Sequence, residues 1–220
     1  HSAAQYVLGK LYQDGVYFNK DMDQAMKWFR SAAELGNEYA AYRMGCLLLL
    51  GEEIPKDVEA AVKWLSLSAE KGNPYAQYRL GMLYLKGEEF SPQVEVAMKW
   101  LQQAAEQKNE WAFYQLGKLY LSGEHVTKNV ETAVHYLGLC AEKGNQYAQY
   151  VLGKLYLCGR DVSRDREKAV EYLTASAEQG NLYASFLLEH LDAYQDPSLF
   201  LAATRLLHHL EKLFCEEVQR

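Results

Sequence analysis

The side chains that could carry acid–base, nucleophilic or metal chemistry are few and scattered through the 220 residues. The six histidines, at positions 1, 125, 135, 190, 208 and 209, do not recur with any period, and the four cysteines include no Cys-x-x-Cys pair. His208, Glu211 and Cys215 would share one side of a helix, but a solvent-facing surface explains them more simply than a metal site does. Glycine-rich phosphate loops and the motifs His-Glu-x-x-His, Gly-x-Ser-x-Gly and Ser-x-x-Lys do not occur at usable positions. We therefore predict a protein that is not an enzyme and has no metal or cofactor.

Tyrosine is the chemically versatile residue that does recur. Fifteen of the 17 tyrosines stand in columns with a period of 36 residues. The columns are Tyr6, Tyr42, Tyr78, Tyr114 and Tyr150; Tyr39, Tyr75, Tyr147 and Tyr183; Tyr12, Tyr84, Tyr120 and Tyr156; and Tyr136 and Tyr172. A tyrosine offers an apolar ring and a hydroxyl, which suits contact with an extended polypeptide at low entropic cost. The Tyr12 column fits a core position, whereas the Tyr6 and Tyr39 columns leave two alternatives open, groove lining and packing between repeats.

These columns belong to a repeat that organises nearly the whole chain. Ala4 is followed at 36-residue intervals by five further alanines, the last of them Ala184, and all but Ala184 precede a glycine by five residues. No residue is gained or lost between copies, which indicates a tandem-repeat architecture. We place five copies within 1–183 and treat the chain as a single continuous domain. The copies are 4–39, 40–75, 76–111, 112–147 and 148–183.

Each copy predicts two helices. The first, which we call helix A, would start after an asparagine such as Asn73, run from about Tyr75 and end at Gly87, with apolar residues on one stripe. The second, helix B, would terminate at a glycine such as Gly72. Its N-cap column is Asp21, Asp57, Asn129 and Asp165, with Gln93 as the exception.

A glycine column within helix A predicts how closely the two helices approach. Glycine inside a helix costs about 1 kcal/mol relative to alanine, so five at one phase need a compensating contact. We expect the column that begins at Gly9 to face the one that begins at Ala25, with Trp28 and Tyr12 filling the adjacent space. On this view Trp64→Ala would cost about 3–5 kcal/mol by opening a cavity.

The repeated pattern Ala-x-x-x-Leu-Gly-x-x-Tyr-x-x-Gly, then a charged loop, then Ala-x-x-Trp-x-x-x-Ala-Ala-x-x-Gly, resembles the Sel-1-like repeat family, which is related to tetratricopeptide arrays. The resemblance covers residues 4–183. The departures are Leu48 for tyrosine, Lys108 for the terminal glycine, and Tyr136 and Tyr172 for tryptophan. The resemblance implies an all-α fold, a right-handed α-solenoid of helix–loop–helix repeats, and a bacterial scaffold or adaptor for protein–protein interactions.

The segment 184–220 departs from the repeat. It keeps the start of a degenerate sixth copy, and Asp196-Pro197 then begins a predicted C-terminal capping helix. Residues 202–210 also resemble the C-terminal ends of mobilisation relaxases from Gram-positive mobile elements. That second resemblance implies an alternative function, an accessory nucleic-acid-binding region of such a relaxase.

Charge is distributed unevenly between the two kinds of helix. The net charge is −6, which argues against a general polyanion-binding protein. The five helix A windows, 3–14, 39–50, 75–86, 111–122 and 147–158, nevertheless contain Asp14 as their only acid. Their bases are Lys10, Arg43, Arg79, Lys86, Lys118 and Lys154. Because burial alone would remove both signs of charge, this pattern predicts a positive strip along helix A.

These observations lead to one functional hypothesis. We expect a concave groove lined by helix A to bind an extended, acidic peptide segment of a partner protein. The proposed groove residues are Tyr42, Arg43, Tyr78, Arg79, Tyr114, Lys118, Tyr150 and Lys154. Aromatic rings beside cations also suit single-stranded nucleic acid, which remains the alternative ligand, and a pure spacer would bind neither. We further expect a cytoplasmic monomer without a membrane segment, because no apolar run approaches 18 residues.

Overall fold

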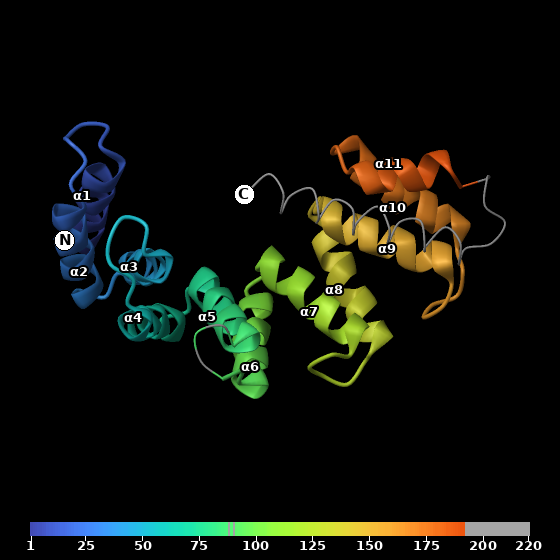
Figure 1. Ribbon diagram of the computed structural model, residues 1–220, viewed down its shortest axis with the longest axis horizontal. Coiled ribbons are helices and arrows are strands. Elements are labelled where there is room, and N and C mark those ends of the chain that lie inside the picture. Colours follow the sequence, from blue (N-terminus) through green and yellow to red (C-terminus); the bar gives the residue numbers. More distant parts are fainter. Residues whose placement is uncertain (88, 90, 192–220) are drawn as a thin grey trace, which may run out of the picture. The chain divides into compact units, whose positions relative to one another are not determined.

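A computed structural model describes residues 1–87, 89 and 91–191. This part of the chain is entirely α-helical in its regular structure, with eleven helices and no strand. In chain order they are α1 (Ser2–Asp14), α2 (Met22–Glu34), α3 (Glu38–Leu50), α4 (Val58–Glu70), α5 (Pro74–Lys86), α6 (Val94–Glu106), α7 (Glu110–Ser122), α8 (Val130–Glu142), α9 (Gln146–Cys158), α10 (Arg166–Glu178) and α11 (Leu182–Glu189) (Figure 1). Odd-numbered helices are helix A of their repeats and even-numbered helices are helix B. The predicted capping helix, and with it His208, Glu211 and Cys215, lies outside the described residues.

The chain separates into two compact units, His1–Ala112 and Phe113–Arg220. Consecutive helices pack against each other from α1 to α6 in the first unit and from α8 to α11 in the second. This arrangement of tandem hairpins is the predicted all-α solenoid. None of the described helices is long and apolar enough to cross a membrane.

The predicted N-caps of helix B are confirmed in four repeats. The side chains of Asp21, Asp57, Asn129 and Asp165 each accept a hydrogen bond from the backbone N–H three residues later, at 2.9–3.0 Å. Such a bond satisfies one of the donors left open at a helix N-terminus. Gln93 makes no side-chain cap bond, so α6 begins without this stabilisation.

The turn that follows helix B also departs in the third repeat. Gly36, Gly72, Gly144 and Gly180 adopt φ values between 88° and 93° at this turn. The equivalent residue after α6 is Lys108, the only described non-glycine residue with a positive φ, at 61°. A side chain in this left-handed region costs roughly 1–2 kcal/mol. Local strain and the missing cap therefore fall at the two ends of the same helix.

The helix A glycines do allow close approach, but the contacting side chain differs from the prediction. A Cβ added to Gly45 would lie 2.6 Å from Leu65 Cγ and 3.1 Å from the carbonyl oxygen of Ala61. The alanine column thus meets the glycine through its backbone, and the large side chain against the glycine is the residue after the tryptophan or tyrosine of helix B. These residues, Phe29, Leu65, Leu101, Leu137 and Leu173, are fully buried. Trp64 is only partly buried, because it packs at the margin of the core rather than within it.

Neighbouring repeats are joined by contacts that recur with the period. Lysines in the A-to-B loop pair with an acid 33 residues later: Lys20 with Glu53, Lys56 with Glu89 at 2.6 Å, and Lys128 with Asp161 at 2.6 Å. Serine hydroxyls on helix B donate to carbonyl oxygens 30 residues earlier, as Ser68 does to Glu38 at 2.7 Å. The exposed ion pairs each contribute little, about 0–1 kcal/mol, so register between repeats rests mainly on the buried leucines and alanines.

Candidate functional site

The Tyr6 column and the Tyr39 column, in which Trp111 replaces one tyrosine, form what we call the aromatic row. Four rings of the Tyr6 column each contact the tyrosine 33 residues later, which lies on helix A of the next repeat. The pairs are Tyr6 with Tyr39 at 6.4 Å, Tyr42 with Tyr75 at 6.2 Å, Tyr114 with Tyr147 at 6.4 Å and Tyr150 with Tyr183 at 6.0 Å between ring centroids. Residues 39 and 42 are neighbours at i, i+3 on α3, so successive pairs continue along each unit. The row is thus built by packing between repeats.

The aromatic row is also partly open to solvent. Tyr39 and Tyr75 are each 50% exposed, and Trp111 and Tyr147 are each 55% exposed. Tyr42, Tyr78, Tyr114 and Tyr150 have intermediate exposure. The two alternatives left open by the sequence are therefore not exclusive, since one part of each ring packs against its neighbour while another part stays accessible.

Burial disfavours ionisation of four hydroxyls of the row. Desolvation raises the pKa of Tyr42 to about 12, with a smaller contribution from Cys46 beside it. Desolvation likewise raises the pKa of Tyr150 to about 12 and raises the pKa of Tyr78 and Tyr114. A tyrosine of ordinary pKa is already neutral at pH 7, so the shift leaves the protonation state there unchanged, and the hydroxyls can donate hydrogen bonds. The hydroxyl of Tyr42 already makes such a bond with Cys46.

The bases of helix A take different positions in the two units. In the second unit, Lys118 Nζ lies 5.6 Å from the ring centroid of Tyr114, and Lys154 Nζ lies 5.8 Å from that of Tyr150. Both are i, i+4 pairs in cation–π contact. In the first unit, Arg43 Nη2 donates to Gln13 Oε1 at 3.0 Å, across the boundary between the first two repeats.

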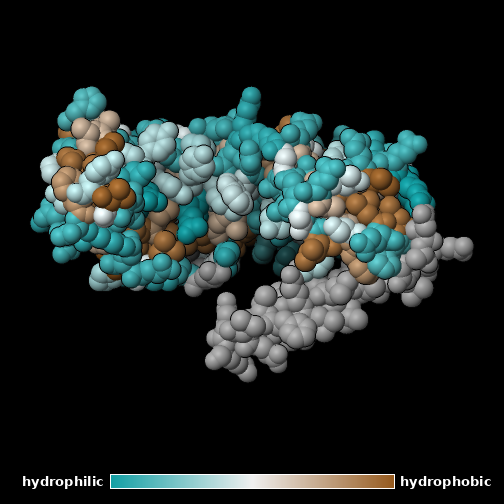
Figure 2. Space-filling model, turned by 90° about the horizontal axis from the view of Figure 1, so that it is seen from above, coloured by the Kyte–Doolittle hydropathy of each residue, from teal (hydrophilic) through white to brown (hydrophobic). Residues whose placement is uncertain are grey.

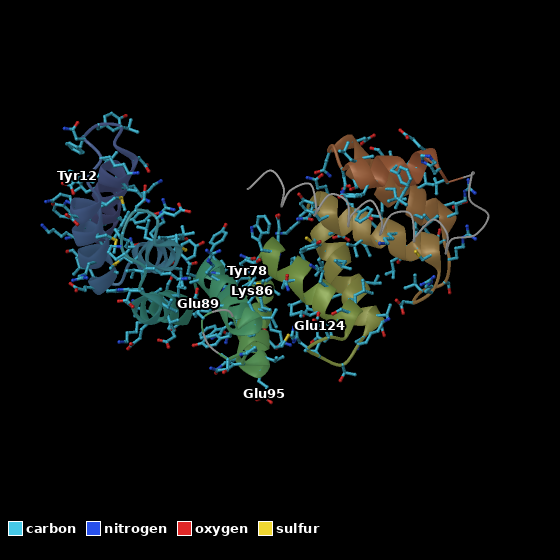
Figure 3. All side chains as sticks on the ribbon, in the orientation of Figure 1. Tyr12, Tyr78, Lys86, Glu89, Glu95 and Glu124 are labelled. Atoms are coloured by element: carbon cyan, nitrogen blue, oxygen red, sulfur yellow. The ribbon has the colours of Figure 1, made fainter. Side chains whose placement is uncertain are left out.

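Arg79 instead lines a pocket of about 270 Å³ in the first unit. The pocket is formed by α5, by one residue of α3 and by the loop after α5. Its lining residues are Leu49, Tyr78, Arg79, Met82, Leu83, Lys86 and Glu89. Figure 3 labels Tyr78 and Lys86 on α5 and Glu89 in the loop. Sequence reasoning named Tyr78 and Arg79 as groove residues but missed Leu49 and Met82, whose apolar side chains gave no signal beyond core packing.

The structure corrects the predicted charge of helix A. Each of the first five A helices begins one residue earlier than its predicted window, which adds Glu38 and Glu110 to Asp14. The count of one acid holds for the predicted windows, whereas the helices themselves carry three acids. Glu38 and Glu110 are the first residues of α3 and α7, where a carboxylate favours the positive end of the helix dipole. The first five A helices thus carry six bases and three acids. The helices α2, α4, α6, α8 and α10 carry six bases and eleven acids.

The sequence of these hairpins matches a known family. The Sel1 repeat model matches residues 2–37, 38–73, 74–109, 112–145 and 146–181, which together span most of the chain. The chain belongs to the Sel1 repeat family. Its Sel1 repeats coincide with the hairpins of the structure, each match starting at or within two residues of the first residue of a helix A.

Solved Sel1 proteins share the fold. The structure of c5321, a protective antigen of uropathogenic Escherichia coli with an SLR fold, is 31% identical over 89% of this chain, with a TM-score of 0.81. A Sel1 repeat protein from Oxalobacter formigenes is 32% identical over 90% of this chain and 80% of its own, with a TM-score of 0.79. This chain spans 43% of the c5321 chain. No curated protein matches the sequence significantly.

More distant solved structures include the immunity protein PA5088 from Pseudomonas aeruginosa. It is 25% identical over 81% of this chain and 67% of its own, with a TM-score of 0.57.

Apolar residues outside the aromatic row gather at one end of the first unit. Figure 2 shows hydrophobic surface at the end that carries α1 and α2. Val7 on α1 is 51% exposed, and Val16 in the following loop is 72% exposed. Ala4 is exposed as well, whereas Ala40 and Ala76 are buried, because in later Sel1 repeats the preceding helix B covers this column.

Proposed function

We propose that the chain is a non-enzymatic scaffold that binds an extended, acidic segment of a partner protein along helix A. The chain belongs to the Sel1 repeat family, whose members generally act in protein–protein interactions. The proposed contacts in the first unit are Tyr42, Arg43, Tyr78 and Arg79. Those in the second unit are Tyr114, Lys118, Tyr150 and Lys154.

One observation carries this proposal. The partly exposed aromatic row and six bases occur together on the A helices, while acids are concentrated on the B helices. A carboxylate on the ligand would accept hydrogen bonds from neutral phenols and pair with nearby cations. An extended backbone would lay alternate side chains against the rings, and rigid tyrosines bind such chains with little loss of side-chain entropy.

The proposal is tested by a peptide array in which every acidic peptide has a counterpart with glutamine in place of glutamate. We expect the purified protein to bind the acidic members and to lose affinity as salt rises. Ranking of neutral peptides above their acidic counterparts would contradict the proposal. A steep loss of oligonucleotide affinity with salt, without peptide binding, would instead favour the nucleic-acid alternative.

Two tyrosine variants locate the binding face. Tyr39→Ser combined with Tyr75→Ser removes two half-exposed rings of the first unit, and we expect peptide affinity to fall roughly ten-fold. The matched control is Tyr17→Ser, because Tyr17 is 78% exposed and belongs to the loop after α1 rather than to a helix A. Equal loss in the control, or none in the double variant, would place binding elsewhere.

A further inference from the structure

We propose that Arg79 is the specificity-determining anchor of the first unit and clamps an acidic side chain of the ligand, while Arg43, which Gln13 holds between two repeats, contributes only its positive charge to the binding face. This inference rests on the proposed function and names the chemistry that its binding face selects. It follows from a difference between two arginines that the sequence makes equivalent.

Arg43 and Arg79 occupy the same column of successive repeats, 36 residues apart. Arg43 is held by Gln13, which lies 30 residues before it on the preceding helix A. The residue 30 before Arg79 is Leu49, which has no polar atom to offer. Among the described residues Arg79 has no hydrogen-bond or ion-pair partner. Because leucine replaces glutamine at the neighbouring position, the guanidinium of Arg79 lacks the hydrogen bond that the guanidinium of Arg43 makes.

The pocket beside Arg79 has the chemistry of a carboxylate site with an apolar floor. Leu49, Met82 and Leu83 supply apolar surface. Lys86 also lines the pocket but already takes part in another interaction, so the site depends on Arg79. Glu89, the one acid among the described lining residues, is already paired with Lys56 at 2.6 Å, which offsets its charge. A guanidinium presents two parallel N–H groups that match a carboxylate, and partial burial strengthens the pairing.

The size and composition of the pocket point to a short motif. In an extended peptide, residues i and i+2 project to the same side. An acidic residue at i could pair with Arg79 while an aliphatic side chain at i+2 covers Leu49 and Met82. The ligand class is therefore a segment in which glutamate or aspartate stands two residues from leucine, isoleucine, valine or methionine.

The decisive variant is Leu49→Gln, which places at Arg79 the amide that holds Arg43. We expect roughly ten-fold weaker binding of glutamate-containing peptides and little change for the glutamine counterparts. All peptides carry an amidated C-terminus, so a side chain is the only carboxylate in the motif. Leu121→Gln is the matched control, since it makes the same change 30 residues before Val151, which stands in the arginine column of the following repeat. Unchanged discrimination in Leu49→Gln, or equal loss in Leu121→Gln, would overturn the proposal.

A second measurement detects the contact without a high-affinity ligand. The capped peptide acetyl-Glu-Ala-Leu-amide, added at millimolar concentration, should shift the Arg79 Nε NMR signal, and its glutamine counterpart should not. The Arg43 signal should stay in place with both. Acidic peptides that depend on Tyr39 and Tyr75 but ignore Arg79→Gln and Leu49→Gln would overturn the anchor and leave the proposed function standing. Failure of every acidic peptide, including the capped probe, would overturn both.

Discussion

Replacing Gly81 with alanine should destabilise the protein even though alanine is the better helix former. The helix propensity of alanine favours the variant by about 1 kcal/mol. The new Cβ, however, would lie 2.6 Å from Leu101 Cγ, 2.9 Å from Leu101 Cδ2 and 3.2 Å from the carbonyl oxygen of Ala97. Leu101 and Ala97 are completely buried, so neither can move aside without disturbing the core. Overpacking of this kind costs about 1–3 kcal/mol, so after the gain of about 1 kcal/mol from helix propensity we expect a net loss of up to about 2 kcal/mol.

The chain contains a matched control for this effect. Gly138 lies inside α8, and a Cβ added there would meet nothing within 4 Å. Gly138→Ala should therefore stabilise the protein by about 0.5–1 kcal/mol through helix propensity and a less flexible unfolded chain.

Urea unfolding followed by far-ultraviolet circular dichroism would give the free energy of unfolding of both variants. Hydrogen exchange would show whether the loss in Gly81→Ala is centred on α5 and α6, as expected for contacts between neighbouring elements of a repeat protein. Stabilisation of Gly81→Ala to the same extent as Gly138→Ala would refute the argument that this glycine column exists for close helix approach.

Three further predictions concern the core, the third repeat and the aromatic row. Leu65→Ala should lower the free energy of unfolding by about 2–5 kcal/mol in a urea titration, because Leu65 is fully buried; a loss below 1 kcal/mol would contradict its central place in the core. Gln93→Asp should supply the missing N-cap of α6, raising the free energy of unfolding by about 0.5–2 kcal/mol and with it the thermal midpoint. Aspartate introduced at the exposed loop residue Asn19 should give no gain. Burial raises the pKa of Tyr42 to about 12. The stability that the neutral hydroxyl contributes is therefore fully present below pH 10 and is lost as the pH rises through 12. In a pH titration, tyrosinate absorbance should show this ionisation at higher pH than that of exposed tyrosines, and Tyr42→Phe should remove it.

The fold could be predicted because each repeat carries local sequence signals that mark where its helices begin and end. Asparagine or aspartate before a helix and glycine after it are local signals, and four of the five helix B caps form as the sequence indicates. The fully buried position that directly follows the tryptophan or tyrosine of helix B, such as Leu65 after Trp64, was less evident. Trp64 and Leu65 are adjacent on one helix turn, and only the approach angle of the neighbouring helix decides which enters the core.

The sequence predicted which residue types line the proposed binding surface, but it did not predict which side chains contact one another there. Columns of tyrosines and bases are visible in the sequence, yet the partner of each ring lies 33 residues away and that of Arg43 lies 30 residues before it. Those offsets arise from how one hairpin stacks on the next, which no single repeat specifies. For this reason the sequence treated Arg43 and Arg79 alike, whereas their neighbours Gln13 and Leu49 distinguish them.

Side-chain NMR of the tyrosines during titration with an acidic peptide would test the central claim most directly. Binding along helix A predicts that signals from Tyr39, Tyr42, Tyr75 and Tyr78 shift together and saturate at one peptide concentration, while Tyr17 stays unchanged. Shifts confined to residues of the B helices or their loops, with the tyrosines of helix A unaffected, would contradict it.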